Sequence, residues 1–158
     1  MRTYRSETHG RLEEEEVFQQ IKKDIEKFPN DEFKIVVGTD SQTYSKTKIV
    51  SVIALLRVGK GGKYFAHVER TKHIENIRVK IYNETMRSLD LSKRLMYFLF
   101  ENELDYDVEI HLDIGNSKKG KTHMLINEIT GWVTAEGFVC YHKPKSFVAS
   151  TIADRISK

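Results

Sequence analysis

Acidic residues lie at two positions where carboxylates could act together. Asp40 ends a short apolar strand predicted over residues 33–40, and Asp113 lies near the end of a strand predicted over residues 107–114. Sites in open α/β sheets form where loops leave the ends of central strands, so both positions suit a binding or catalytic site. Aspartate also ends strands because it favours turns, and this explains either residue taken alone.

Glu84 is harder to explain by local structure. It lies in a helix predicted over residues 75–100, on a stripe with i, i+4, i+7 spacing that should face the sheet. The other members of this stripe are Ile77, Ile81, Ser88, Leu91, Leu95 and Phe98. A carboxylate turned towards a sheet loses hydration, which is unfavourable unless a partner compensates. A metal ion is one such partner, and an ion pair with Lys80 or Arg87 is the other.

The remaining sequence predicts the elements that must position these carboxylates. An amphipathic helix over residues 12–28 comes first, and Pro29 and Asn30 end it. Three strands, a long helix, a strand, a helix, a strand and a closing helix follow, over residues 33–40, 49–58, 63–69, 75–100, 107–114, 122–136, 138–142 and 147–156. Residues 59–62, Gly-Lys-Gly-Gly, predict a hairpin between the second and third strands.

This order of elements predicts an α/β fold. Three antiparallel strands followed by crossover strands give a mixed five-stranded sheet with helices on both faces. The first helix then stands outside the sheet, so we expect an N-terminal helical extension over residues 1–30 and one domain over residues 31–158. No linker or internal repeat divides the sequence further.

Composition narrows the class of protein. The chain of 158 residues is 39% hydrophobic and 31% charged, which is typical of a soluble globular domain. It has neither an apolar run of about 20 residues nor a secretory signal, so we expect no membrane partner. The single cysteine, Cys140, forms no internal disulfide and indicates a cytoplasmic protein. A net charge of +3 is compatible with a polyanionic partner.

Short motifs accompany this order of elements. They are Val37-Gly-Thr-Asp-Ser-Gln42, Gly59-Lys-Gly-Gly-Lys-Tyr-Phe65, Glu84-Thr-Met-Arg-Ser-Leu89, His111-Leu-Asp-Ile-Gly115, Gly120-Lys-Thr122, Gly131, and Lys143-Pro144 through Ser157-Lys158. With these motifs the chain resembles the ribonuclease H-like superfamily and, more closely, the bacterial YkuK family within it. The resemblance covers the chain from about Phe33 to its end and leaves the first helix outside the core fold.

The resemblance implies four metal ligands: Asp40, Glu84, Asp113 and Asp154. Asp154 enters through the resemblance alone, because the pattern of the closing helix directs it away from the apolar face. Clustered carboxylates suit Mg²⁺ or Mn²⁺, which prefer oxygen ligands. Two such ions about 4 Å apart can activate a water and stabilise the leaving oxygen of a phosphodiester. We therefore expect a metal-dependent nuclease that acts on RNA, DNA or a hybrid.

Other residues are candidates for supporting roles. Lysines of the Lys- and Gly-rich loop and of the segment before the last helix could contact a nucleic-acid backbone as point charges. These are Lys118, Lys119, Lys121, Lys143 and Lys145. Ser41 and Gln42 beside Asp40 are accessory candidates, as is His111, which shares a strand face with Asp113 and could orient water. The sequence indicates nucleic acid as the partner without specifying its kind, and indicates no oligomeric state.

Two other functions compete with nuclease activity. A nucleic-acid-binding module could keep the fold without turnover. Alternatively, residues 115–122 fit the pattern G-x-x-x-x-G-K-[ST] of a phosphate-binding P-loop, between a predicted strand and helix. Too few residues follow Thr122 for the parallel sheet that a P-loop NTPase builds after this loop, so we expect nucleotide binding to be the least favoured of the three.

Overall fold

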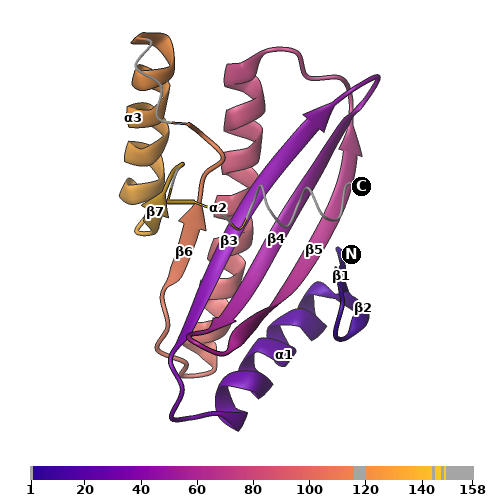
Figure 1. Cartoon of the computed structure of the whole chain (residues 1–158), viewed down its shortest axis with the longest axis vertical. Coiled ribbons are helices and arrows are strands. Elements are labelled where there is room, and N and C mark those ends of the chain that lie inside the picture. The colour runs from indigo at the N-terminus through magenta and orange to yellow at the C-terminus, as the bar shows by residue number, and fades with distance from the viewer. Residues whose placement is uncertain (1, 116–119, 144, 147, 149–158) are drawn as a thin grey trace.

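The computed structural model describes residues 2–115, 120–143, 145, 146 and 148 (Figure 1). The elements along this part of the chain are β1 (Thr3–Ser6), β2 (Gly10–Glu13), α1 (Glu14–Lys27), β3 (Phe33–Thr43), β4 (Thr47–Arg57), β5 (Gly61–Thr71), α2 (Ile77–Glu101), β6 (Val108–His111), α3 (Gly120–Ala135) and β7 (Val139–Tyr141). No helix in these residues is both long enough and apolar enough to span a membrane.

The strands form one mixed sheet in the order β2-β1-β5-β4-β3-β6-β7. Its centre is the long antiparallel meander of β3, β4 and β5, which are rich in β-branched residues (Figure 1). Both β6 and β7 join in parallel, β6 on β3 and β7 on β6. The predicted hairpin between β4 and β5 is confirmed, and its turn contains Gly59 and Gly61, with φ of 78° and 98° that favour glycine.

One face of the sheet packs against all three described helices. Alternate residues of β3, β4 and β6, including Ile35, Ile53 and Ile110, belong to a cluster that also contains side chains from each helix. The helix residues in this cluster are Val17, Phe18, Ile21 and Ile25 of α1, Ile81, Leu89, Leu91, Leu95, Phe98 and Leu99 of α2, and Leu125, Ile126, Ile129 and Val133 of α3.

The opposite face carries a smaller apolar cluster. It consists of Val36, Val50, Val52, Ala54 and Ala66, together with Val148, which is fully buried. The prediction of helices on both faces depends on the closing helix over residues 147–156, of which the structure describes only Val148. The described helices therefore all cover one face.

The prediction of five strands was wrong, because the sheet has seven. The two unpredicted strands, β1 and β2, have the sequences Thr-Tyr-Arg-Ser and Gly-Arg-Leu-Glu, which lack the apolar alternation that identifies a strand. Tyr4 is their buried residue, and β1 pairs with β5 at the register of Arg5 and Ala66. The N-terminal residues thus extend the sheet, and α1 contributes to the same core as α2 and α3.

Two boundaries differ from prediction in ways that affect the site. Strand β3 continues to Thr43, so Asp40 lies within a strand and is buried. Strand β6 ends at His111, which is also its last residue paired with β3, so Asp113 lies two residues beyond the strand. In α2, the stripe predicted to face the sheet begins one turn later than expected, since Ile77 is 63% exposed and Ile81 is buried.

Candidate metal centre

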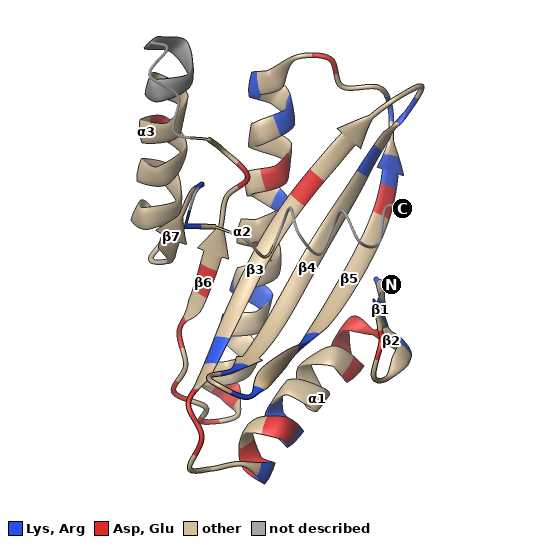
Figure 2. Ribbon diagram, viewed as in Figure 1, with Lys and Arg blue, Asp and Glu red and all other residues tan. Residues whose placement is uncertain are grey.

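Three carboxylates from three elements converge at one edge of the sheet. Asp40 of β3, Glu84 of α2 and Asp113 after β6 each offer an oxygen, and these oxygens all lie within 4.8 Å of one another. Figure 2 shows the acidic segments of β3, of α2 and of the chain just after β6 at the same level of the sheet.

The parallel register explains why the two aspartates meet. Gly38 of β3 is paired with His111 of β6, the last pair between the two strands. Asp40 and Asp113 each follow this pair by two residues, and side chains two residues apart along a strand share a face. The two carboxylates are therefore brought side by side at the same edge. This convergence was the expectation from the positions of the two aspartates in the sequence.

Helix α2 adds Glu84 through contacts with β3. The hydroxyl oxygens of Thr39 and Ser88 are hydrogen-bonded at 2.8 Å, which fixes the helix against the strand one turn from Glu84. The Glu84 carboxylate accepts hydrogen bonds from the backbone N–H of Ser41 at 3.0 Å and from the Ser41 hydroxyl. Glu84 is 4% exposed, so the expected inward direction of this glutamate is confirmed.

Two lysines supply positive charge at the cluster. Lys80 Nζ lies 2.7 Å from Glu84 Oε2 and 3.8 Å from Asp40 Oδ1. Lys143 Nζ lies 2.6 Å from Asp113 Oδ1. The ion pair of Lys80 with Glu84, which the sequence left open as an alternative to a metal, is therefore present. Arg87, the other candidate partner of Glu84, pairs with Glu69 instead.

Burial and mutual repulsion perturb these carboxyl groups strongly. Burial, together with the hydrogen bond to Asp113 and the charges of Asp113 and Glu84, raises the pKa of Asp40 to about 8. Burial also raises the pKa of Glu84, against the effect of Lys80. Although burial opposes it, the hydrogen bonds from Asp40 and Lys143 lower the pKa of Asp113. At neutral pH Asp40 is therefore protonated and Asp113 is ionised.

The donor set fits a hard divalent cation. All three residues offer carboxylate oxygens, the ligand type that Mg²⁺ and Mn²⁺ prefer, and each side chain comes from a rigid element or its end. A proton on Asp40 and the ammonium groups of Lys80 and Lys143 offset part of the negative charge in this structure. A divalent ion would provide the same compensation in place of these groups.

Of the predicted accessory residues, Ser41 contacts the carboxylate cluster directly. Ser41 touches Glu84, as described above, while Gln42 is half-buried in β3 opposite Lys48 of β4. His111 is buried and lies outside the three-carboxylate group; its Nε2 is 3.5 Å from Glu109 Oε2 and its ring packs edge-on against Tyr141. Burial lowers the pKa of His111.

The predicted lysines are only partly described. Lys143 contacts Asp113, and Lys145 is exposed beside a pocket over Val36 and Tyr64. Lys118, Lys119 and Asp154 lie outside the described residues, as does most of the loop of the P-loop pattern. The backbone of Lys121 lies in the first turn of α3, and its side chain is likewise outside the described part.

Sequence reasoning missed the hydroxyl pair that fixes α2 to β3. In β3, Thr39 and Ser41 alternate with Asp40, and both point to the helix, where they meet Ser88 and Glu84. Ser88 was recognised only as a member of the buried stripe. A hydroxyl on that stripe opposite hydroxyls on alternate strand residues was a signal for this contact.

The fold and the carboxylate site define a protein of the ribonuclease H-like class, and comparison with known proteins agrees. A family model described as "Ribonuclease H-like" matches residues 16–158, so the chain belongs to that family. It is similar to the protein named "Uncharacterized protein YkuK" of Bacillus subtilis (strain 168), with 36% identity over 160 residues, which covers 91% of this chain and 90% of that relative. No solved structure matches the chain.

Proposed function

We propose that this protein is a divalent-metal-dependent nuclease that hydrolyses phosphodiester bonds of RNA, DNA or a hybrid. The observation that carries the proposal is the convergence of Asp40, Glu84 and Asp113 from separate elements, with oxygens within 4.8 Å of one another. Carboxylates placed together in a buried setting are unfavourable unless a cation or proton compensates them. Membership of the ribonuclease H-like family supports a nucleic-acid substrate.

In this proposal the three carboxylates hold Mg²⁺ or Mn²⁺, with Asp154 as the fourth ligand that the resemblance implies. The bound ions would activate water and stabilise the leaving oxygen of the scissile phosphodiester. Ser41 orients Glu84 through two hydrogen bonds to its carboxylate, so that Glu84 keeps one geometry. Asp40 gives up its proton when it becomes a ligand.

Lys80 and Lys143 have a second task in this proposal. Each lies on a carboxylate of the cluster, Lys80 on Glu84 and Lys143 on Asp113. Once a divalent ion compensates these carboxylates, both ammonium groups are released next to the place where the scissile phosphate must bind. Point charges of this kind hold phosphate oxygens well. The two lysines then contribute to substrate binding at the centre.

A titration with Mn²⁺ followed by calorimetry tests the metal site. The parent should bind Mn²⁺, and Asp113→Asn should lose most of that binding, whereas Asp105→Asn, a change of an exposed aspartate after α2, should bind like the parent. Equal binding by the Asp113→Asn variant and the parent would contradict the site. Cleavage of labelled RNA, DNA and hybrid should then require the metal and should vanish in Asp40→Asn.

A non-catalytic nucleic-acid-binding module is the second candidate. The observation in its favour is that Lys80 and Lys143 already pair with Glu84 and Asp113, so that these two carboxylates have cationic partners without a metal. In that case the parent and Asp40→Asn would bind labelled nucleic acid alike, and neither would cleave it with Mg²⁺ or Mn²⁺. If the parent cleaves nucleic acid and Asp40→Asn does not, this candidate is excluded.

A further inference from the structure

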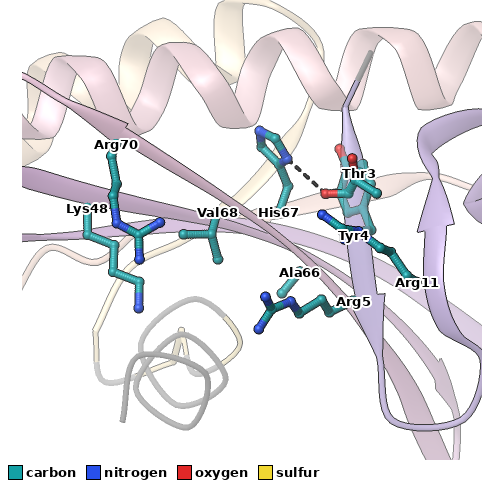
Figure 3. A pocket seen from close by; sticks show the side chains of 9 residues that line it. All are labelled: Thr3, Tyr4, Arg5, Arg11, Lys48, Ala66, His67, Val68 and Arg70. Atoms are coloured by element: carbon teal, nitrogen blue, oxygen red, sulfur yellow. Dashed lines mark hydrogen bonds between the residues drawn. The ribbon is translucent and has the colours of Figure 1, made fainter.

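A second, cationic pocket lies on the sheet where β1, β4 and β5 meet (Figure 3). It has a volume of about 250 Å³ and is lined by the basic side chains of Arg5, Arg11, Lys48 and Arg70. Among the described residues that line it there is no aspartate or glutamate. At one side the imidazole Nδ1 of His67 is hydrogen-bonded to the carbonyl of Thr3 at 3.0 Å, which fixes the ring. The pocket thus suits an anion.

The register of the strands places the basic residues in like-charged pairs. Arg5 of β1 is directly opposite Arg11 of β2, and Lys48 of β4 is directly opposite Arg70 of β5. Like charges at directly opposite positions of a sheet destabilise it. Within the part of the chain that the structure describes, none of the four forms an ion pair or a side-chain hydrogen bond. A bound anion would relieve both repulsions.

The same register relates this pocket to the carboxylate cluster. Asp40, Val50 and Val68 form one row across β3, β4 and β5. The next row on the same face contains Lys48 and Arg70. Lys48 is therefore a diagonal neighbour of Asp40, a position at which Cα atoms are about 7–8 Å apart. Figure 2 shows basic segments at this end of β4 and β5, next to the acidic segment of β3.

The spread of the two pairs favours a ligand with several phosphates. Arg5 is in register with Ala66 of β5, four residues from Arg70, and strands rise by about 3.3 Å per residue, so the two pairs are roughly 13 Å apart along the sheet. Successive phosphates of a nucleic-acid strand can contact both pairs without all four side chains converging on one point, and arginine binds phosphate oxygens in a bidentate manner.

We infer that Arg5, Arg11, Lys48 and Arg70 bind backbone phosphates of the nucleic-acid strand whose neighbouring phosphodiester lies at the carboxylate centre. This inference rests on the proposed function, since it takes nucleic acid as the substrate. The Lys48–Arg70 pair holds a phosphate next to the centre, and the Arg5–Arg11 pair holds one farther along the strand. The N-terminal strands β1 and β2 thereby become part of the substrate-binding surface.

Fluorescence anisotropy with labelled single-stranded RNA, single-stranded DNA and a hybrid duplex tests this inference, in EDTA so that no strand is cleaved. Two variants each remove one pair, Arg5→Gln with Arg11→Gln and Lys48→Gln with Arg70→Gln. The control, Lys23→Gln with Lys27→Gln on α1, removes the same charge from two exposed lysines. Each pocket variant should bind about tenfold more weakly at low salt, because hydrogen bonds to charged groups are lost.

The dependence on salt gives a second readout. The slope of the logarithm of affinity against the logarithm of salt concentration should fall by about 0.7 for each lost phosphate contact with a single strand. The control should keep the slope of the parent. Melting curves of all variants should coincide with that of the parent or lie above it, because each pair removes a repulsion. Pocket variants that match the control in both affinity and slope would overturn the inference.

A calorimetric titration with inorganic phosphate and with pyrophosphate separates a free anion from a nucleic-acid backbone. If these anions bind through the arginines while the affinity for oligonucleotides is unchanged in the variants, the pocket serves a free phosphate and the inference is wrong. If the parent cleaves no substrate but the pocket variants bind oligonucleotides more weakly, the nuclease proposal is wrong and the pocket assignment stands. If the parent cleaves its substrate and the pocket variants bind like the parent, the pocket assignment is wrong and the nuclease proposal stands.

Discussion

Asp40 and Asp113 lie side by side, each two residues beyond Gly38–His111, the last pair of the parallel strands β3 and β6. Burial and the neighbouring carboxylates raise the pKa of Asp40 to about 8, whereas hydrogen bonds from Asp40 and Lys143, against the effect of burial, lower the pKa of Asp113. Two buried carboxylates in contact cannot both ionise unless a cation stabilises the second charge. Since Lys143 pairs with Asp113, the proton resides on Asp40, and a divalent ion must displace it.

Metal binding should therefore release protons. At pH 7 the carboxyl of Asp40 is protonated, so binding of Mn²⁺ should release about one proton and should weaken as the pH falls. Calorimetry in two buffers with different enthalpies of ionisation measures this number, because the observed enthalpy then depends on the buffer. An enthalpy that is the same in both buffers would contradict the protonation of Asp40 at pH 7.

The variant Asp40→Asn should be more stable than the metal-free parent at high pH. The pKa of Asp40 in the folded protein is raised above its unfolded value of 3.8, to about 8. The stability that this group contributes is thus fully present below pH 4 and is lost as the pH rises through about 8. The asparagine has no such loss, so its advantage in urea unfolding should grow from pH 5 to pH 8 by roughly 3 kcal/mol.

The control for this measurement is Asp105→Asn, which changes an exposed aspartate and should follow the parent at both pH values. Because a metal ion would hide the effect, the unfolding must be measured in EDTA. An advantage of Asp40→Asn that shrinks between pH 5 and pH 8 would show that the Asp40 carboxyl is not the protonated member of the pair.

Removal of Lys80 should destabilise the metal-free protein and leave the metal-bound protein almost unchanged. The Lys80→Gln variant leaves Glu84 buried without its ion pair, and breaking a buried pair from one side costs about 3 kcal/mol. Mn²⁺ should restore most of this loss, because it compensates the same carboxylate. Urea unfolding with and without Mn²⁺ measures both effects.

The matched control is Lys93→Gln, which breaks an ion pair with Glu136 in which the lysine is 50% exposed. Exposed pairs contribute little, so this change should cost less than about 1 kcal/mol, with or without Mn²⁺. A Lys80→Gln variant that is as stable as Lys93→Gln in EDTA would show that Lys80 does not compensate the cluster.

Glu14 should make the attachment of the N-terminal strands sensitive to acid. It accepts hydrogen bonds from Arg94 of α2 and from the hydroxyl of buried Tyr4 in β1. Burial raises the pKa of Glu14, but the hydrogen bonds from Arg94 and Tyr4 outweigh it and lower the pKa below its ordinary value of 4.5. The stabilising contribution is therefore present above pH 4.5 and is lost as the pH falls through the lower, folded-state pKa.

The test is the variant Glu14→Gln compared with the parent at pH 7 and at pH 3. At pH 7 the variant should be less stable by about 1–2 kcal/mol, because it leaves Arg94 without its charged partner. At pH 3 the difference should narrow. A difference that stays the same at both pH values would mean that the glutamate charge contributes nothing to this contact.

Features of the fold and the site were predictable where the sequence carried a local pattern, such as helical periodicity or a glycine-rich turn. The inward direction of Glu84 followed from a helical stripe, and the hairpin before β5 followed from its glycines. The meeting of Asp40 with Asp113 was expected from strand ends, although β3 extends three residues beyond Asp40. The exact register of β3 with β6 is a tertiary property, which no local pattern specifies.

Other features had no local signal. Strands β1 and β2 bury mainly Tyr4, so their side chains carry no apolar alternation from which a strand is predicted. Ile77 fits the helical stripe but lies before the helix reaches the sheet, and it is 63% exposed. Lys143 was expected to face a nucleic acid, yet its contact with Asp113 depends on how the residues after β7 return to the site.

The short outermost strands have a consequence for solubility. The sheet ends in β2, of four residues, and in β7, of three, whereas β5 is an eleven-residue strand that would be the margin of the sheet without the N-terminal hairpin. A long open margin exposes backbone N–H and C=O groups that can pair with another chain, while a short one with charged residues such as Arg11 and Glu13 resists such pairing. The hairpin of β1 and β2 therefore hinders such pairing around Ala66, where Arg5 pairs with β5.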